Sequence, residues 1–158
     1  MFQNRSGNQL TRQALAYIHN YVRVPPGYNE VSNMPLVSLE LQKCSAIALS
    51  YGTLAGLTHL QPGYVEMPPK GHLEEMLNKM ETSGEGVQAI IVPSGFKELL
   101  EMRRCCNELK IEIVGYYLGC VLETGSAGRD VIVLPSDNKV AIYTSRKKYE
   151  KKFKFRHE

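Results

Sequence analysis

The feature that most constrains the fold is a pair of short apolar runs, residues 44–50 and 52–60, which follow each other almost without a break. Short apolar runs bounded by turn residues are typical of buried β-strands. The turn near Gly52 between two such runs predicts a hairpin of antiparallel strands. Because the far ends of antiparallel neighbours lie side by side, this hairpin is expected to bring Cys44 close to His59.

Helices and further strands are expected on both sides of the hairpin. Helical periodicity covers residues 9–23, where Asn8 or Thr11 can cap the first turn. Proline and glycine predict loops over residues 24–35 and 61–71. The other expected helices are 72–81 and 95–110, and the other expected strands are 36–42, 87–93, 111–119, 131–135 and 140–145.

These elements predict one mixed α/β domain. No repeat is visible and no linker divides the 158 residues, a length that suits a single domain. We expect a core over residues 22–145, an added N-terminal helix at 8–23 and a basic tail at 146–158 that is at best partly ordered. Strands around 38–59 are expected to pack against those around 87–143, with the helices on one outer face.

The net charge of +3 belongs to the end of the chain and not to its body. Residues 145–158 hold seven of the 19 Lys and Arg residues and two of the 16 acidic residues, so the rest of the chain carries 12 basic and 14 acidic groups, a net −2. Such an end could bind nucleic acid or another acidic partner through salt-sensitive contacts. A solvated segment that aids solubility is the commoner case, so nucleic acid is not the expected partner.

Cysteine usage and hydropathy favour a cytoplasmic protein. The four cysteines show no CxxC spacing, and Cys105 and Cys106 are adjacent within a helical pattern, which suits reduced thiols. No run approaches the roughly 18 apolar residues of a membrane helix, and the polar start is unlike a secretory signal. We therefore expect no membrane insertion. Export as an effector without a cleaved signal stays open.

A thiol beside an imidazole allows nucleophilic catalysis. The ring of His59 can accept the proton of the Cys44 thiol, and the resulting thiolate is the nucleophile. A hydroxyl or a backbone carbonyl must fix the tautomer of the ring, and Ser38, six residues before Cys44, offers a hydroxyl from the same strand region. Buried cysteines and single histidines are also ordinary core residues, so spacing alone leaves both interpretations open.

No metal or other cofactor is expected. His72 together with His59 and a cysteine could bind zinc, but neither a CxxC nor an HExxH spacing is present, and a histidine at a helix end is the simpler interpretation. Cys120 is expected in the core. Arg129 could bind a substrate carboxylate, but it is more simply the end of a turn.

Residues 38–44 (SLELQKC) place a hydroxyl six positions before a cysteine, and residues 56–62 (GLTHLQP) form a Gly-x-x-His strand with proline close behind. A Gly-Arg-Asp turn follows at 128–130. These segments, in this order, resemble the CheD family of chemoreceptor glutamine deamidases and, more distantly, the deamidase toxins of the cytotoxic-necrotizing-factor type. The resemblance covers residues 22–145.

This resemblance implies an α/β sandwich of two packed sheets with flanking helices, and a protein glutamine deamidase without a cofactor. It makes Cys44 the nucleophile, His59 the general base and then acid, and Ser38 the residue that orients His59. The substrate implied is an exposed glutamine of a chemoreceptor or a host protein, which becomes a glutamate. A regulatory protein partner is compatible with the same resemblance.

The residues before the cysteine leave an alternative open. Gln42 and Lys43 stand where the family has Gly-Ser. Small residues there would let the backbone approach a substrate carbonyl closely. Their replacement motivates the alternative of a catalytically inactive CheD-like scaffold that acts as a protein-binding module.

Overall fold

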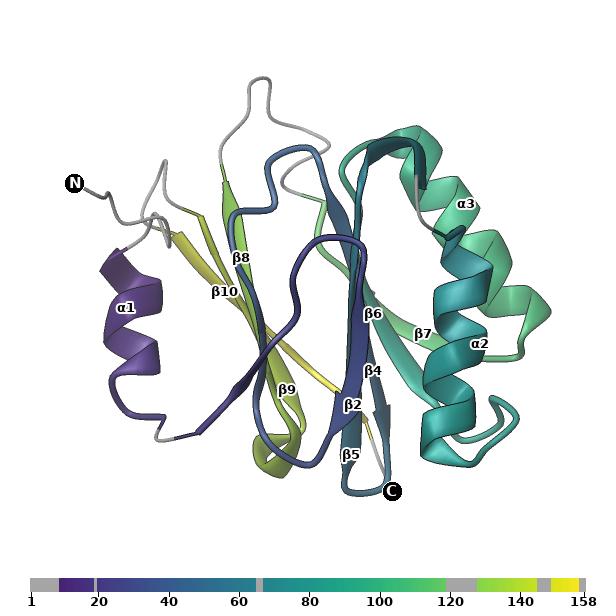
Figure 1. The fold of residues 1–158 in the computed structure, drawn as a ribbon, viewed down its shortest axis with the longest axis horizontal. Coiled ribbons are helices and arrows are strands. Elements are labelled where there is room, and N and C mark those ends of the chain that lie inside the picture. The colour runs from purple at the N-terminus through teal and green to yellow at the C-terminus, as the bar shows by residue number, and fades with distance from the viewer. Residues whose placement is uncertain (1–8, 19, 65–66, 119–127, 145–148, 157–158) are drawn as a thin grey trace.

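The computed structural model describes residues 9–18, 20–64, 67–118, 128–144 and 149–156. These residues form two five-stranded sheets packed face to face, with helices outside both sheets (Figure 1). Each sheet contains parallel and antiparallel pairs. The predicted fold class, a mixed α/β sandwich of two packed sheets with flanking helices, is confirmed. The expectation that the helices share one outer face is wrong, because α1 (Gln9–Leu15) covers the face opposite to the other two.

The sheet next to α1, sheet A, has the strand order β1-β3-β8-β9-β10. Side chains of α1 and of the turn after it pack on its buried outer residues, among them Leu15 and Ile18 on Val37 and Ile132. The strands of sheet A are β1 (Val22–Arg23), β3 (Leu36–Ser38), β8 (Arg129–Leu134), β9 (Lys139–Thr144) and β10 (Tyr149–Lys154).

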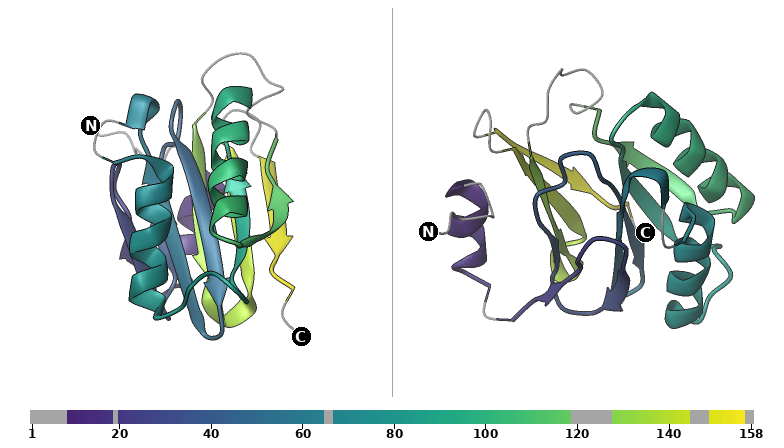
Figure 2. Two further views of the ribbon diagram at one scale, coloured as in Figure 1. Left: turned by 90° about the vertical axis from the view of Figure 1, so that its right-hand side faces the viewer. Right: turned by 45° about the horizontal axis from the view of Figure 1, so that its top comes forward.

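The second sheet, sheet B, has the order β2-β5-β4-β6-β7. Its strands are β2 (Asn29–Ser32), β4 (Ser45–Tyr51), β5 (Leu54–Leu60), β6 (Gln88–Val92) and β7 (Glu112–Tyr116). The helices α2 (Pro69–Met80) and α3 (Phe96–Glu108) lie side by side over its outer face (Figure 2). Short 3-10 turns cover Pro62–Tyr64 and Pro135–Asp137. Within the ranges described, no helix combines the length and the apolar character needed to cross a membrane.

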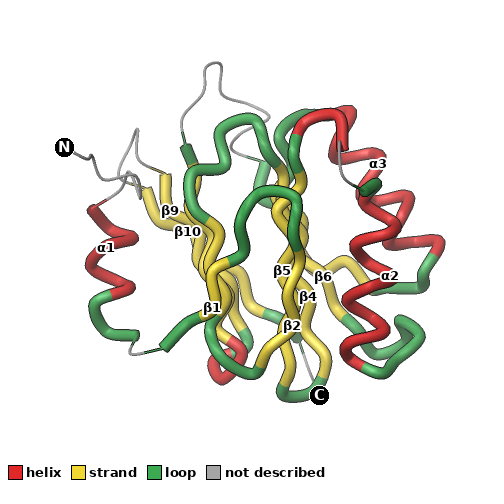
Figure 3. Tube along the Cα trace, in the orientation of Figure 1, coloured by secondary structure: helices red, strands yellow, loops and turns green. Residues whose placement is uncertain are grey.

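The predicted hairpin is confirmed as β4 and β5, and β4 lies between β5 and β6 in sheet B (Figure 3). Both faces of β4 are buried, because sheet A covers one face and the helices α2 and α3 cover the other. Ala46 and Ala48 belong to the core between the sheets, whereas Ile47 and Leu49 belong to the core under the helices. Burial on both faces explains why this strand reads as a continuous apolar run without polar alternation.

The N-terminal region departs from the prediction. The helix expected over residues 9–23 ends at Leu15, and Val22 and Arg23 form β1, which pairs parallel with β3. Residues 24–35, expected to be a loop, contain β2, which pairs with the edge of β5. Sheet edges offer unpaired backbone N–H and C=O groups, and pairing with them outweighs weak local preferences.

The segment that links the two sheets also differs from the prediction. The strand expected over residues 36–42 ends at Ser38, and the chain then turns at Glu40, whose φ is 57°. Residues 39–44, which we call the cysteine loop, therefore carry the chain from sheet A to sheet B. As a result, Ser38 lies in the sheet opposite Cys44 and not in the same strand region.

The basic end of the chain is part of the fold. Residues 149–154, expected in the tail, form β10 and pair antiparallel with β9. Phe155 is 5% exposed and lies in the core between the sheets. The backbone N–H and C=O of Arg156 both hydrogen-bond the side-chain amide of Gln88 on β6. This segment therefore joins the last strand of sheet A to sheet B.

Replacing Phe155 by alanine is expected to destabilise the protein by about 3 kcal/mol, because it removes a large side chain from a closed core. The free energy of unfolding, measured by urea denaturation, checks this. Lys154→Ala is the matched control, since Lys154 is exposed and its replacement should change stability by less than about 0.5 kcal/mol. Equal stability of the two variants would mean that the end of the chain is not part of the folded core.

Candidate active site

The reactive side chains gather at the end of the sandwich where β4 begins. Cys44 directly precedes β4, and Ala46 pairs with His59 near the end of β5. Residues two apart in an extended chain face the same side of a sheet, so Cys44 and His59 both face the space between the sheets. Cys44 packs there against the core between the sheets and is half-buried. The hairpin therefore brings the predicted thiol and imidazole to one face, as expected from the sequence.

His59 is held at one ring nitrogen and open at the other. The residue is 1% exposed, and its Nδ1 lies 3.3 Å from the carbonyl oxygen of Val24. A carbonyl oxygen only accepts hydrogen bonds, so Nδ1 carries the ring proton and Nε2 presents its lone pair. Among the described residues, Nε2 is buried and has no hydrogen-bond partner. An oriented imidazole with an open, buried acceptor is suited to act as a general base.

Ser38 reaches the same carbonyl from the opposite sheet. Its hydroxyl donates to the Val24 carbonyl oxygen over 2.9 Å, so this oxygen receives both Ser38 and His59. The N–H of Val24 donates in turn to the carbonyl of Val37 on β3, over 2.8 Å. The group that fixes the tautomer of His59 is thus a backbone carbonyl. Ser38 acts on His59 through Val24 and does not touch its ring nitrogens.

The thiol and the imidazole are both neutral near neutral pH. Burial raises the pKa of the Cys44 thiol, and the nearby Arg129 guanidinium opposes this in part. Burial lowers the pKa of His59 to about 4, which the bond to Val24 opposes and the charge of Arg129 reinforces. Because Nε2 has no partner, the thiol is not bonded to it. The structure thus presents two neutral groups on one face, without a thiolate–imidazolium ion pair.

A buried arginine lies directly behind the cysteine loop. Arg129 is 2% exposed and begins β8, so the expectation that it ends a turn is wrong. Its guanidinium donates to four backbone carbonyl oxygens, those of Leu41 (3.0 Å), Cys44 (3.0 Å), Pro93 (3.1 Å) and Gln42 (3.4 Å). Apart from the Gly-Arg-Asp resemblance, no feature of the sequence indicates that Arg129 lies at this site. Residues 119–127, which contain the start of that predicted turn and Cys120, lie outside the described residues.

Asp130 holds the cysteine loop at a second point. The residue is 2% exposed, and its carboxylate accepts hydrogen bonds from the backbone N–H of Glu40 and from the hydroxyl of Thr11 on α1, both over 2.7 Å. Burial raises the pKa of Asp130 to about 6, although these two bonds oppose the rise. α1, the cysteine loop and β8 therefore meet at one buried carboxyl group.

His72 is separate from this site. It lies on α2, and its Nδ1 is 2.8 Å from the amide nitrogen of Asn29, which also donates to Glu75. Burial lowers the pKa of His72. Since α2 covers the outer face of sheet B and His59 faces sheet A, the two histidines cannot share a metal. No group of three or more His, Cys, Asp or Glu residues in the described part of the chain could hold a metal ion.

The two cysteines of α3 are core residues. Cys105 and Cys106 are 1% and 0% exposed and pack between α3 and sheet B. Burial raises the pKa of both thiols, that of Cys106 to about 12. Both thiols are free and packed in the core.

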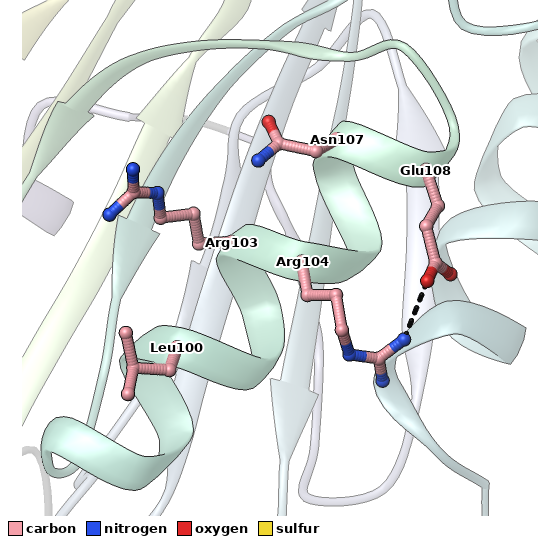
Figure 4. Close-up of a pocket in the computed structure, with 5 residues that line it drawn as sticks. All are labelled: Leu100, Arg103, Arg104, Asn107 and Glu108. Carbon is pink, nitrogen blue, oxygen red and sulfur yellow. Dashed lines mark hydrogen bonds and ion pairs between the residues drawn. The ribbon is translucent and has the colours of Figure 1, made fainter.

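A shallow depression on the outer surface of α3 has no reactive group. Its lining residues are Leu100, Arg103, Arg104, Asn107 and Glu108 (Figure 4). Arg104 is engaged by Glu101 and Glu108 over 2.8 and 2.7 Å. The depression lies on the far side of sheet B from His59, so it is not part of the same site.

Comparison with known proteins bears on the fold alone. No family model and no curated protein matches the chain. The structure is similar to the hypothetical protein YfiH of Bacillus licheniformis, with a TM-score of 0.45 and 10% identity over 56% of this chain and 49% of that one. It is also similar to protein NMB0706 of Neisseria meningitidis, of the family DUF152, with a TM-score of 0.49 and 10% identity over 68% of this chain and 66% of that one. The chain thus covers about half of the first protein and 66% of the second.

Cys44 is expected to ionise above the pKa of an exposed cysteine, about 8.5, because its thiol is partly desolvated. The measurement is the rate of alkylation of Cys44 against pH, in a variant whose other three cysteines are alanine. The His59 ring should titrate near pH 4 when it is followed by NMR in the same variant. An alkylation midpoint below that of a free cysteine would contradict the neutral pair and indicate a preformed thiolate.

Asp130→Asn is expected to change how stability depends on pH. Because the pKa of Asp130 in the folded protein is raised from 3.8 to about 6, its contribution is present below pH 3.8 and lost as the pH rises through about 6. The loss for a shift of this size is at most about 3 kcal/mol. The stability of Asp130→Asn relative to the wild type should therefore rise across this window in urea denaturation. A difference that stays constant with pH would mean that Asp130 titrates as an exposed carboxyl.

Proposed function

We propose that the protein is a cysteine-dependent glutamine deamidase of the CheD type, which hydrolyses the side-chain amide of a glutamine in a target protein. The observation that carries the proposal is the open Nε2 of His59, fixed as an acceptor by the carbonyl of Val24 on the sheet face that it shares with Cys44. A nucleophile, a base and a group that orients the base form the minimal arrangement for acyl transfer. The resemblance of residues 38–44 and 56–62 supports glutamine as the substrate.

In the first half of the reaction, Sγ of Cys44 attacks the side-chain carbonyl carbon of the glutamine. Since the thiol is neutral at rest, its proton passes to Nε2 of His59 as the carbon–sulfur bond forms. The protonated ring then donates this proton to the amide nitrogen, the carbon–nitrogen bond breaks, and ammonia leaves. The product is a thioester between Cys44 and the target protein.

In the second half, a water molecule attacks the thioester while Nε2 of His59 takes its proton. The carbon–sulfur bond breaks, the proton returns to Sγ of Cys44, and a glutamate side chain is released. The sum is glutamine and water giving glutamate and ammonia. The target protein gains one negative charge at neutral pH.

The low pKa of His59 favours the step in which ammonia leaves. Burial makes the neutral ring a weak base, and the same burial makes the protonated ring a strong acid. Expulsion of an amine from a tetrahedral intermediate needs a proton on the nitrogen, and the ring of His59 can supply it. The His59 ring is therefore a weak base when Cys44 attacks, but this is offset because the protonated ring is a strong acid when ammonia leaves.

The proposed target is a folded protein with an exposed glutamine, a chemoreceptor or a host protein. Cys44 is half-buried at the end of the sandwich, so a glutamine side chain on a protruding surface can approach it. We propose that the protein acts in the cytoplasm of the producing cell, or of a host cell if it is exported as an effector.

The alternative is a catalytically inactive scaffold that binds a partner protein. The absence of a bond between the thiol of Cys44 and Nε2 of His59 favours it, as does the Gln42-Lys43 pair in place of Gly-Ser. Such a protein would bind its partner equally well with Cys44 or His59 replaced. Loss of deamidation in these variants, with the wild type active, is the result that separates the two functions.

Cys44→Ala is expected to abolish deamidation, and His59→Gln is expected to lower its rate by about two orders of magnitude or more, because these changes remove the nucleophile and the proton carrier. The measurement is mass spectrometry of the proteome of cells that produce each variant, searched for glutamines converted to glutamate.

The matched control is Cys105→Ala, which removes a thiol on the other side of sheet B and should leave deamidation intact. Thermal unfolding of each variant tests whether the fold is kept. Identical sets of converted glutamines in cells producing the wild type and Cys44→Ala would exclude the deamidase.

A further inference from the structure

Three carbonyl groups of the cysteine loop point towards its inner side. The guanidinium group of Arg129 donates hydrogen bonds to the carbonyl oxygens of Leu41, Gln42 and Cys44. The described chain contains no cis peptide bond, and in a trans peptide the C=O and N–H groups point in opposite directions. The N–H groups of Gln42 and Lys43 belong to the peptides whose carbonyls Arg129 holds, so they point away from it, to the outer side of the loop.

These N–H groups are open. Within the described ranges, no acceptor is bonded to the backbone N–H of Gln42 or Lys43. The N–H of Glu40, by contrast, is bonded to Asp130, and that of Leu41 to the carbonyl of Arg129. The two residues immediately before Cys44 in the chain therefore both have an open backbone donor.

We infer that Arg129 is a positioning residue: by holding the carbonyls of the cysteine loop on its inner side, it keeps the backbone N–H groups of Gln42 and Lys43 open beside Cys44 for the oxygen of the substrate amide. This inference rests on the proposed deamidase function. Two preorganised N–H donors suit the negative charge that develops on this oxygen as the thiol adds to the carbonyl carbon.

The geometry of the arginine side chain is what the arrangement needs. A guanidinium group presents five N–H donors in a rigid plane and can hold several carbonyls at once, whereas a lysine ammonium is a compact charge on a flexible stem. The donors of the loop are main-chain groups, so they do not require glycine or serine at positions 42 and 43. The Gln42-Lys43 pair is therefore compatible with a working site.

The test compares Arg129→Lys, which keeps the charge but loses the planar set of donors, with Arg129→Gln, which loses both. The probes are iodoacetate and iodoacetamide, which alkylate Cys44 in a background with the other three cysteines replaced by alanine. The open N–H groups should give iodoacetate, an anion, a higher relative rate at Cys44 than at an unstructured cysteine peptide. In both variants the ratio of the iodoacetate rate to the iodoacetamide rate should fall about tenfold, which is the effect of losing one charge-assisted hydrogen bond.

The pH profile separates the position of Arg129 from its charge. The midpoint for alkylation should rise in Arg129→Gln, which lacks the cation near the thiol, and stay close to the wild-type value in Arg129→Lys. Arg104→Gln, on the outer face of α3, is the control and should behave as the wild type. A full iodoacetate preference in Arg129→Lys overturns the inference, as does an unchanged preference in Arg129→Gln.

Thermal unfolding checks each variant. If Arg129→Gln does not fold, Arg129→Lys alone decides. Because alkylation needs no turnover, this experiment tests the arrangement of the cysteine loop even if no deamidated target is found.

Discussion

The antiparallel pairing of β4 with β5 decides where the reactive groups can lie. In its register Ala46 faces His59 and Ala48 faces Leu57, so small side chains on one strand lie beside large ones on the other. A slip by one residue would turn His59 from the space between the sheets to the side covered by helices. Burial of β4 on both faces makes such a slip costly. The position of the imidazole is therefore a consequence of core packing in the middle of sheet B.

A single backbone carbonyl couples this hairpin to the other sheet. The oxygen of Val24 receives Ser38 from sheet A and His59 from sheet B, and Val24 itself is bonded to Val37 on β3. Both donors are buried, and a buried donor without an acceptor would cost about 1–3 kcal/mol. The short strand β1 thus does more than extend a sheet. The residue that follows it, Val24, places a carbonyl acceptor between the two sheets for these two donors. The same contact fixes the tautomer of His59.

The parts of the site that depend on local pattern could be predicted from the sequence. The two apolar runs and the turn at Gly52 were enough to place Cys44 and His59 on one face, because strand pairing follows from short-range order. The predicted position of Ser38 in the strand region of Cys44 is wrong, because the turn at Glu40 contains no glycine or proline that would indicate it in the sequence. The parts that depend on contacts between distant segments were missed. Arg129 bonds carbonyls 85 and 88 positions away, and no periodicity in the chain signals such a partner.

The electrostatics of this end of the sandwich follow from burial around one cation. Desolvation disfavours every charged form, which raises the pKa of Cys44 and lowers that of His59. Arg129 lowers the pKa of both groups, because a fixed positive charge stabilises a thiolate and destabilises an imidazolium. A thiolate–imidazolium ion pair is therefore not the resting state. If Cys44 attacks a substrate as proposed, the Arg129 cation would stabilise the negative charge that develops. In the proposed mechanism, the neutral thiol would become nucleophilic as a substrate carbonyl accepts electrons from the sulfur and the thiol proton passes to Nε2 of His59.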